Sequence, residues 1–280
     1  MKNRQLIINA DDFGLTDGVN QAILKLSRLG MVSSASIMVN QIMHQGQKFT
    51  HAITKHLGLG IHLNLTCGKP ILPPEDVDTL VNSDGEFMDS HLFFQSLNKI
   101  HIIQVEKEWR AQIIGFSVKF GKPDHLDSHH HIHLFPRYFP LFLQLASELK
   151  VPVRLPVSWD LIPELIELGD FSGIGRFISP DMIEQDLRLM QGSGIRFPDY
   201  FVDNFLPHLN NDPILIQKAF RYLPLGVTEL MCHPGFADRQ LEQSSSYVFE
   251  READFRALSN RSLKKCLDGE HIEIINYKRV

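Results

Sequence analysis

Histidine is concentrated in one short segment of this 280-residue sequence. The chain has 14 histidines, and five of them lie between residues 125 and 133, in the stretch PDHLDSHHHIHLFP. On an extended backbone His129, His131 and His133 share one face, whereas a helical turn brings His129 and His133 together. Either arrangement presents imidazoles to a divalent ion. Apolar residues interleave with the histidines, which favours a packed segment over a solvated loop.

Two adjacent aspartates, Asp11 and Asp12, follow the first apolar segment, LIINA. One aspartate after a strand is common, because it caps the next helix. Successive side chains of an extended chain point to different sides, so one carboxylate can bind a metal ion while its neighbour faces a reacting group. Taken alone, the pair fits a cap and a site equally well.

Three further polar residues lie within or directly after short apolar segments. His62 lies in GIHLNLT, Arg154 in VPVRLP, and His233 follows VTELMC. An arginine inside an apolar strand needs an acid, and Arg154 beside Asp11 would form a charge-assisted pair that keeps the carboxylate ionised. The alternatives are a hydrogen-bonded core histidine at position 62 and an Arg154 that reaches solvent.

The elements that must position these residues alternate between short apolar runs and segments of helical period. The expected strands are Gln5–Ala10, Ser34–Val39, Leu59–Leu65, His125–Ser128, Val151–Pro156, Tyr200–Asn204, Val227–Cys232 and His271–Asn276. Helices are expected near 17–29, 45–56, 103–119, 137–149, 180–191, 211–222 and 250–268. This alternation predicts an α/β fold with a parallel sheet, and eight strands fit an irregular (β/α) TIM-like barrel. A doubly wound open sheet is the rival, but no GxGxxG follows the first strand.

We expect a single domain over residues 1–280, with two longer loop insertions at about 66–102 and 234–247. The first contains paired prolines and an Asp-Gly turn, and the second is rich in Gly, Ser and Gln. Both follow expected strands, at the end of a barrel where active-site loops lie.

The carboxyl ends of parallel barrel strands converge on one mouth, so the acids and histidines above are expected to meet there. One aspartate with two histidines leaves coordination positions free for water and substrate, which is typical of catalytic metal sites. The predicted chemistry is metal-assisted hydrolysis of an amide or an ester.

Composition excludes several other classes. The formal charge of −5 and the pI near 6.3 leave no basic footprint for nucleic acid. The three cysteines are far apart and predict neither a disulfide framework nor a thiolate zinc site. No apolar run approaches the roughly 18 residues of a membrane span, and no signal peptide is recognisable. We therefore expect a cytoplasmic protein.

Four motifs, NADDFG, GIHLNLT, HLDSHHHIHLFP and MCHPG, occur in this order over residues 9–235. Together they resemble the YdjC family of carbohydrate deacetylases, which includes chitooligosaccharide deacetylases and hopanoid-associated deacetylase-like proteins. That family is related to NodB-type polysaccharide deacetylases. The resemblance implies an irregular barrel and a hydrolase that removes the acetyl group from an N-acetylated sugar or oligosaccharide.

The resemblance also implies roles for individual residues. The metal ligands would be Asp12, His62 and His129; Asp11 would be the general base, His233 the general acid, and Arg154 a further catalytic residue. His131 and His133 stay open as replacement or additional ligands. Mg²⁺ is implied for the single divalent ion, although imidazoles generally favour Zn²⁺ and other transition metals.

Two other interpretations remain. Another barrel metallohydrolase, such as an amidohydrolase or a phosphoesterase, would need more ligands for a two-metal centre. A non-catalytic sugar-binding or regulatory protein would have no use for both Asp11 and His233. A homodimer is expected from base rates alone.

Overall fold

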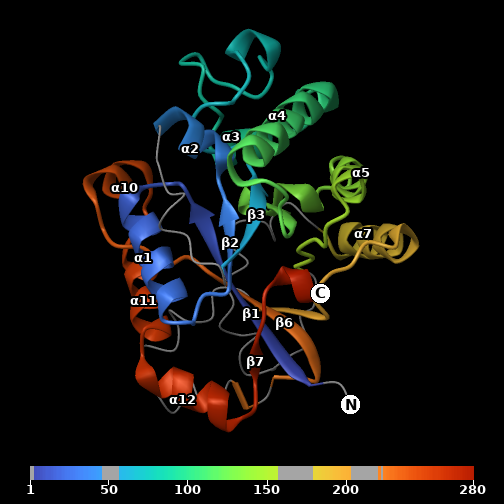
Figure 1. Cartoon of the computed structure of the whole chain (residues 1–280). Coiled ribbons are helices and arrows are strands. Elements are labelled where there is room, and N and C mark those ends of the chain that lie inside the picture. Colours follow the sequence, from blue (N-terminus) through green and yellow to red (C-terminus); the bar gives the residue numbers. More distant parts are fainter. Residues whose placement is uncertain (1–2, 46–56, 157–178, 203–219, 222) are drawn as a thin grey trace.

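A parallel β-sheet forms the centre of the molecule (Figure 1). The computed structural model describes residues 3–45, 57–156, 179–202, 220–221 and 223–280. Within them the strands are β1 (Arg4–Phe13), β2 (Ser34–Ile37), β3 (Gly58–Leu63), β4 (Leu126–Ser128), β5 (Tyr200–Val202), β6 (Gly226–Cys232) and β7 (Glu273–Ile274). Their order is β4-β3-β2-β1-β6-β5, and β7 pairs with β1. Every strand pair among the described residues is parallel.

The first strand, β1, organises this sheet. Its residues from Arg4 to Ala10 pair with β6, and its other edge pairs first with β7 and then with β2. One side of the strand thus pairs with β6, and the other side pairs with strands from both ends of the sequence.

Helices cover the outside of the sheet. They are α1 (Asp17–Arg28), α2 (Val39–Gln45), α3 (Ser90–Gln95), α4 (Ile102–Phe120), α5 (Phe139–Leu149), α7 (Pro180–Ser193), α10 (Arg239–Ser244), α11 (Phe249–Leu258) and α12 (Arg261–Gly269). Helix α1 packs on β1 and against α11, α4 packs on β3 and against α2, and α5 packs against α7. None of the helices in the described ranges is long and apolar enough to span a membrane.

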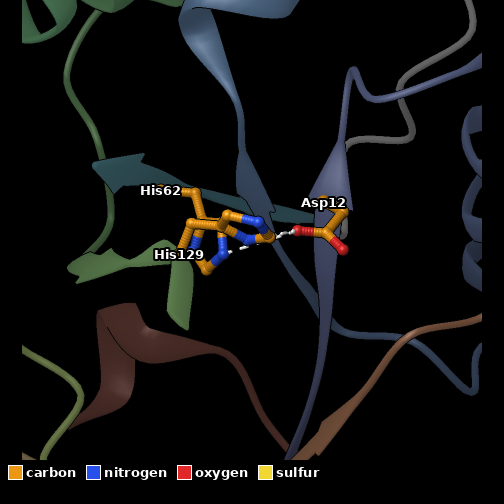
Figure 2. A group of neighbouring side chains, drawn as sticks. All are labelled: Asp12, His62 and His129. Carbon is orange, nitrogen blue, oxygen red and sulfur yellow. Dashed lines mark ion pairs between the residues drawn. The ribbon is translucent and has the colours of Figure 1, made fainter. Parts of the chain in front are cut away.

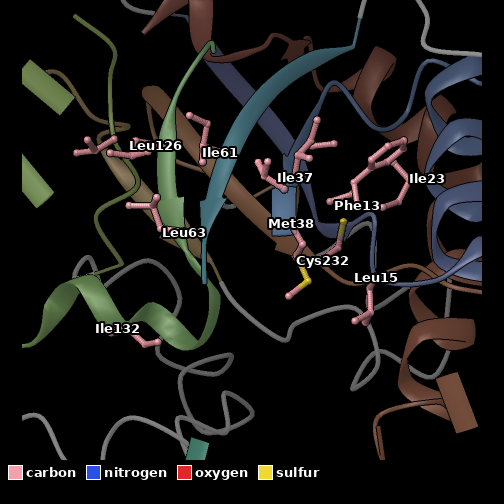
Figure 3. Close-up of a cluster of buried hydrophobic side chains, with 14 of the residues drawn as sticks. Phe13, Leu15, Ile23, Ile37, Met38, Ile61, Leu63, Leu126, Ile132 and Cys232 are labelled. Atoms are coloured by element: carbon pink, nitrogen blue, oxygen red, sulfur yellow. The ribbon is translucent and has the colours of Figure 1, made fainter. Parts of the chain in front are cut away.

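The apolar core lies between the sheet and these helices. Leu6, Ile8 and Ala10 alternate along β1 and are buried in this cluster. Figure 3 shows how side chains of β2, β3 and β4 continue it, with Ile37, Ile61 and others packed side by side. The strands of the sheet thus bury one face in the apolar core.

The other face of the sheet is polar and concave. Arg154 Nη1 lies 2.6 Å from Asp11 Oδ2 on β1 and 3.1 Å from Asp127 Oδ2 on β4. In a flat sheet these strands would stand about 14 Å apart, at three spacings of about 4.8 Å. The sheet is therefore strongly curled, which agrees with the predicted α/β fold and with part of an irregular barrel.

Several expected elements differ from the structure. Val151–Pro156 is not a regular strand. Only Val153 forms a bridge, to Leu126 on β4, and the N–H of Val153 donates on its other side to the carbonyl of Arg196. The expected helix 250–268 is two helices, because Asn260 interrupts it and caps α12 through Ser262 N. The expected helices near 45–56 and 211–222 fall almost entirely outside the described residues, as do the last two residues of the strand expected at Tyr200–Asn204.

The two expected insertions contain short elements of their own. The segment 66–102 holds a 3₁₀ turn at Pro74–Asp76 and helix α3, and 234–247 holds α10. The single-domain organisation stays a prediction.

Candidate metal centre and active site

Asp12, His62 and His129 come together at the carboxyl ends of β1, β3 and β4 (Figure 2). Asp12 Oδ1 lies 3.5 Å from His62 Nε2 and 3.1 Å from His129 Nδ1. One ligand atom from each residue lies within 4.8 Å of the other two. Asp12 and His62 are fully buried and His129 is partly buried.

The backbone of β1 explains how adjacent aspartates face different partners. The pairing with β2 shifts register between Ala10 and Phe13, and Asp12 adopts a left-handed conformation with φ of 66°. Such bulges re-aim side chains, and aspartate tolerates this conformation better than most residues. The carboxylate of Asp12 consequently turns to the histidines while Asp11 turns to Arg154.

His62 is fixed from behind by an acid on the neighbouring strand. Its Nδ1 lies 2.8 Å from Asp127 Oδ1, so Nδ1–H donates and Nε2 faces Asp12. Burial alone would lower the pKa of His62, but Asp127 and Asp11 raise it to about 9. In the metal-free protein this imidazole carries a proton that an ion would have to replace.

The histidine run folds in neither of the two ways expected from the sequence. The run lies in a 3₁₀ segment, His129–Leu134, which is interrupted by His130 and His131 with left-handed φ of 53° and 48°. The rings of His129 and His130 lie 3.9 Å apart in a tilted arrangement, and His130 Nδ1 lies 2.9 Å from Thr66 Oγ1. Consecutive left-handed non-glycine residues are costly and are typical of functional sites.

Neither His131 nor His133 belongs to the metal group in the described part of the chain. His133 Nδ1 lies 2.6 Å from Ser128 Oγ, and its ring stacks on Phe142. The ring of His131 packs edge-on against Phe201. Burial lowers the pKa of His133 to about 3, which is characteristic of a neutral core histidine.

Arg154 is buried and holds Asp11 in a bidentate pair. Its Nη1 and Nη2 donate to the two oxygens of Asp11 over 2.6 and 2.7 Å, and Nε donates to Glu229 Oε1 over 2.9 Å. Tyr277 donates its hydroxyl to the other oxygen of Glu229. Since Arg154 contacts Asp11, Asp127 and Glu229 at once, it positions acids from three strands.

His233 follows β6 and lies at the edge of the same site. Its backbone N–H donates to Asp254 Oδ2 over 2.7 Å, and its ring packs edge-on against Tyr247. Burial lowers the pKa of His233 to about 4, although the nearby charges of Asp12 and Asp11 act to raise it. The imidazole is therefore neutral at pH 7 in the metal-free protein.

The residues present fit a divalent ion. Within the described ranges the buried Asp12 Oδ1 makes no hydrogen bond of good geometry, although it faces two imidazole nitrogens at 3.5 and 3.1 Å. Ligand atoms about 2.1 Å from one ion lie roughly 3.0–3.4 Å apart, close to the distances found here. An aspartate with two histidines suits Zn²⁺ and other transition ions as well as Mg²⁺.

A second group of ligand-type atoms, from Asp11, His62 and Asp127, lies alongside. Arg154 Nη1 already bridges the two carboxylates of this group. A guanidinium thus supplies the positive charge that a second ion would bring, and His62 is shared with the first group. The geometry favours one metal position.

The sequence reasoning did not single out several buried residues of the site, namely Asp127, Glu229, Arg251 and Tyr277. Glu229 had a signal, since it interrupts the apolar strand VTELMC as Arg154 interrupts VPVRLP. Arg251 and Tyr277 had none, because each lies in a segment of ordinary polarity far along the chain from its partner.

The fold and the site define an α/β protein with a buried aspartate–histidine group at the carboxyl ends of a curled parallel sheet. The chain belongs to the YdjC-like family: the family model described as "YdjC-like protein" matches residues 5–269.

Named relatives agree with this placement. A "Carbohydrate deacetylase" of Brevibacillus brevis is 32% identical over 99% of both chains. A "Carbohydrate deacetylase" of Halalkalibacterium halodurans is 33% identical over 92% of this chain and 97% of the relative. The crystal structure of an Enterococcus faecalis protein named for cellobiose-phosphate cleavage superposes with a TM-score of 0.79 at 29% identity, covering 99% and 98% of the two chains.

Proposed function

We propose that this protein is a metal-dependent deacetylase that hydrolyses the acetamide of an N-acetylated sugar or oligosaccharide. The observation that carries the proposal is the buried Asp12 Oδ1, which faces ring nitrogens of His62 and His129 at 3.5 and 3.1 Å. Membership in the YdjC-like family and the carbohydrate deacetylase names of relatives supply the substrate class.

Asp12, His62 and His129 would hold a single divalent ion. When bound, such an ion polarises the acetyl carbonyl and lowers the pKa of a water molecule. Asp127 keeps His62 in the tautomer that presents Nε2, and Arg154 keeps Asp11 oriented. Both contacts are buried, so they hold the reacting groups in a low-dielectric environment.

Asp11 is the proposed general base, which accepts the proton of the attacking water. Arg154 donates hydrogen bonds to both oxygens of Asp11 and so fixes their direction. His233 is the proposed general acid for the departing sugar amine. Because its pKa is about 4 in the free protein, this role requires His233 to gain a proton before the amine leaves.

Acetate release from N-acetylglucosamine mono- and oligosaccharides tests the proposal. Metal-stripped protein is resupplied separately with Mg²⁺, Zn²⁺, Mn²⁺, Co²⁺ and Ni²⁺, with D11N as the inactive control. We expect metal-dependent acetate release that D11N abolishes. Folded protein that binds metal and releases no acetate from any sugar would refute the deacetylase assignment and favour the sugar-binding alternative.

The rival two-metal hydrolase has less support, since Arg154 occupies the space between the acids of the second group. The cytoplasmic location and the homodimer stay predictions.

A further inference from the structure

The two oxygens of Asp12 face different partners. Oδ1 faces His62 and His129, whereas Oδ2 accepts a hydrogen bond from Arg251 Nη2 over 2.5 Å. The side chains of Asp12 and Arg251 are only 1% and 5% exposed, so this contact is shielded from water. We propose that Arg251 is a positioning residue that commits one oxygen of Asp12 to the metal, an inference that rests on the proposed metal-dependent function.

Arg251 lies where its charge is unfavourable for its own helix. It is in the first turn of α11, between Glu250 and Glu252, where the helix dipole disfavours a cation. A buried arginine at this place breaks a local rule without benefit to the helix. Such departures mark positions at which function determines the residue.

The arginine is itself held in one orientation. Its Nε donates to the carbonyl of Tyr247 over 3.1 Å, and its guanidinium lies 5.7 Å from the centre of the Tyr247 ring. Gly235 makes room for the aliphatic stem, because a Cβ there would come within 3.2 Å of Arg251 Cβ and Cδ. The glycine of the MCHPG motif thus supports a contact to the first motif of the chain.

This arrangement has a chemical consequence for Asp12. With Oδ2 engaged by a fixed guanidinium, the carboxylate offers the metal a single oxygen in a set direction. Outer-shell partners of this kind commonly change metal affinity by about 10–100-fold when removed.

Zn²⁺ binding to the metal-stripped full chain tests the inference, measured by competition with a chromophoric chelator. We expect R251M to bind Zn²⁺ about 10–100-fold more weakly than the wild type. Arg256 on the same helix supplies the matched control, since it is 56% exposed and pairs only with Glu252 among the described residues. R256M should bind Zn²⁺ as the wild type does.

A second measurement separates positioning from general damage. Acetate release by R251M should recover at saturating metal, because a misdirected ligand weakens binding of the ion and leaves the other reacting groups in place. Far-UV circular dichroism checks the fold of each variant, and R251K replaces R251M if the latter does not fold. If neither folds, Arg251 serves the fold itself and the inference is wrong.

If folded R251M binds Zn²⁺ with an affinity within twofold of the wild type, the inference about Arg251 is wrong and the proposed function is unaffected. A wild type that binds no divalent ion overturns both the inference and the proposed function. A third outcome is that the wild type binds Zn²⁺ tightly, R251M binds it more weakly, and the wild type releases no acetate. This result would retain the inference about Arg251 and reject the deacetylase function.

Discussion

Asp127 lies directly behind His62, with Oδ1 2.8 Å from Nδ1, and the opposite ring nitrogen of His62 faces Asp12. The acid thereby fixes both the tautomer and the direction of the imidazole. An aspartate–histidine pair of this kind raises the basicity of a metal ligand. The relationship was not apparent in the sequence, because the two residues lie on different strands, 65 positions apart.

We predict that D127N weakens metal binding by about 10–100-fold, because the amide cannot hold His62 as a carboxylate does. Isothermal titration calorimetry with Zn²⁺ measures the effect. D124N is the matched control, since Asp124 precedes the same strand but contacts Leu59 N and Lys278 instead of the site. Equal affinities for D127N and D124N would contradict the prediction.

R154K should lower acetate release by about 100-fold or more and the free energy of unfolding by about 3–5 kcal/mol. Lysine cannot donate in parallel to both oxygens of Asp11 and also reach Glu229. Urea unfolding and steady-state kinetics give the two values. R110K, which alters an exposed bidentate pair with Glu148, should change stability by less than about 1 kcal/mol. A fully active R154K would show that Asp11 does not need the bidentate pair with Arg154.

Metal content should be one ion per chain. The second possible group, Asp11 with His62 and Asp127, already contains the guanidinium of Arg154. Inductively coupled plasma mass spectrometry on dialysed protein gives the ratio. A ratio near two would favour the amidohydrolase or phosphoesterase alternative.

Asp186 on α7 should make stability fall as pH rises from about 4 to 7. Both of its carboxyl oxygens are buried without hydrogen-bond partners among the described residues, and burial raises its pKa to about 7. The unfolded value is about 3.9, so the folded state favours the protonated form. The cost of ionisation is absent below about pH 4, grows between pH 4 and 7, and is complete above.

D186N should accordingly stabilise the protein by roughly 2–4 kcal/mol at pH 8 and much less at pH 4. Urea unfolding at the two pH values measures the difference. D181N serves as the control, because Asp181 is exposed in the first turn of the same helix. A gain for D186N that does not depend on pH would exclude this titration as its cause.

G60A should destabilise the fold by about 3 kcal/mol, at the upper end of the range for overpacked cores. A Cβ at position 60 would lie 2.1 Å from Cε1 of His125, whose ring stacks on Tyr277 and leaves no space to move. Thermal unfolding tests this. G192A on α7 is the counterpart: a Cβ there meets nothing within 4 Å, so alanine should stabilise by up to about 1 kcal/mol. Similar shifts for both variants would contradict the packing argument.

Periodicity predicted the strands of the sheet well where burial is two-sided. Gln5–Ala10 and Val227–Cys232 are mainly apolar segments, and both are central strands. Val151–Pro156 has the same character but forms only the bridge between Val153 and Leu126, and on its other side the Val153 N–H donates to a loop carbonyl, that of Arg196. Apolar sequence reports burial, whereas regular pairing also needs an available neighbouring strand.

The site residues were predictable to the extent that they interrupt apolar strands. Asp12, His62 and His129 meet as the convergence of strand ends requires. The conformation of the histidine run was not predictable, because it depends on two left-handed residues that no local signal marks. Arg251 and Tyr277 were not predicted as site residues for a different reason: their partners lie 239 and 48 residues away in the sequence.

The pairing of β1 also has a consequence for synthesis of the chain. Arg4 pairs with Gly226, so one edge of the first strand waits for 222 further residues to leave the ribosome. At about 5–20 residues per second this takes roughly 10–45 s. During that interval the nascent chain carries an unpaired apolar edge, which is a template for aggregation. The nascent N-terminal strand therefore depends on chaperones or on other parts of the chain to cover this edge until β6 has been synthesised.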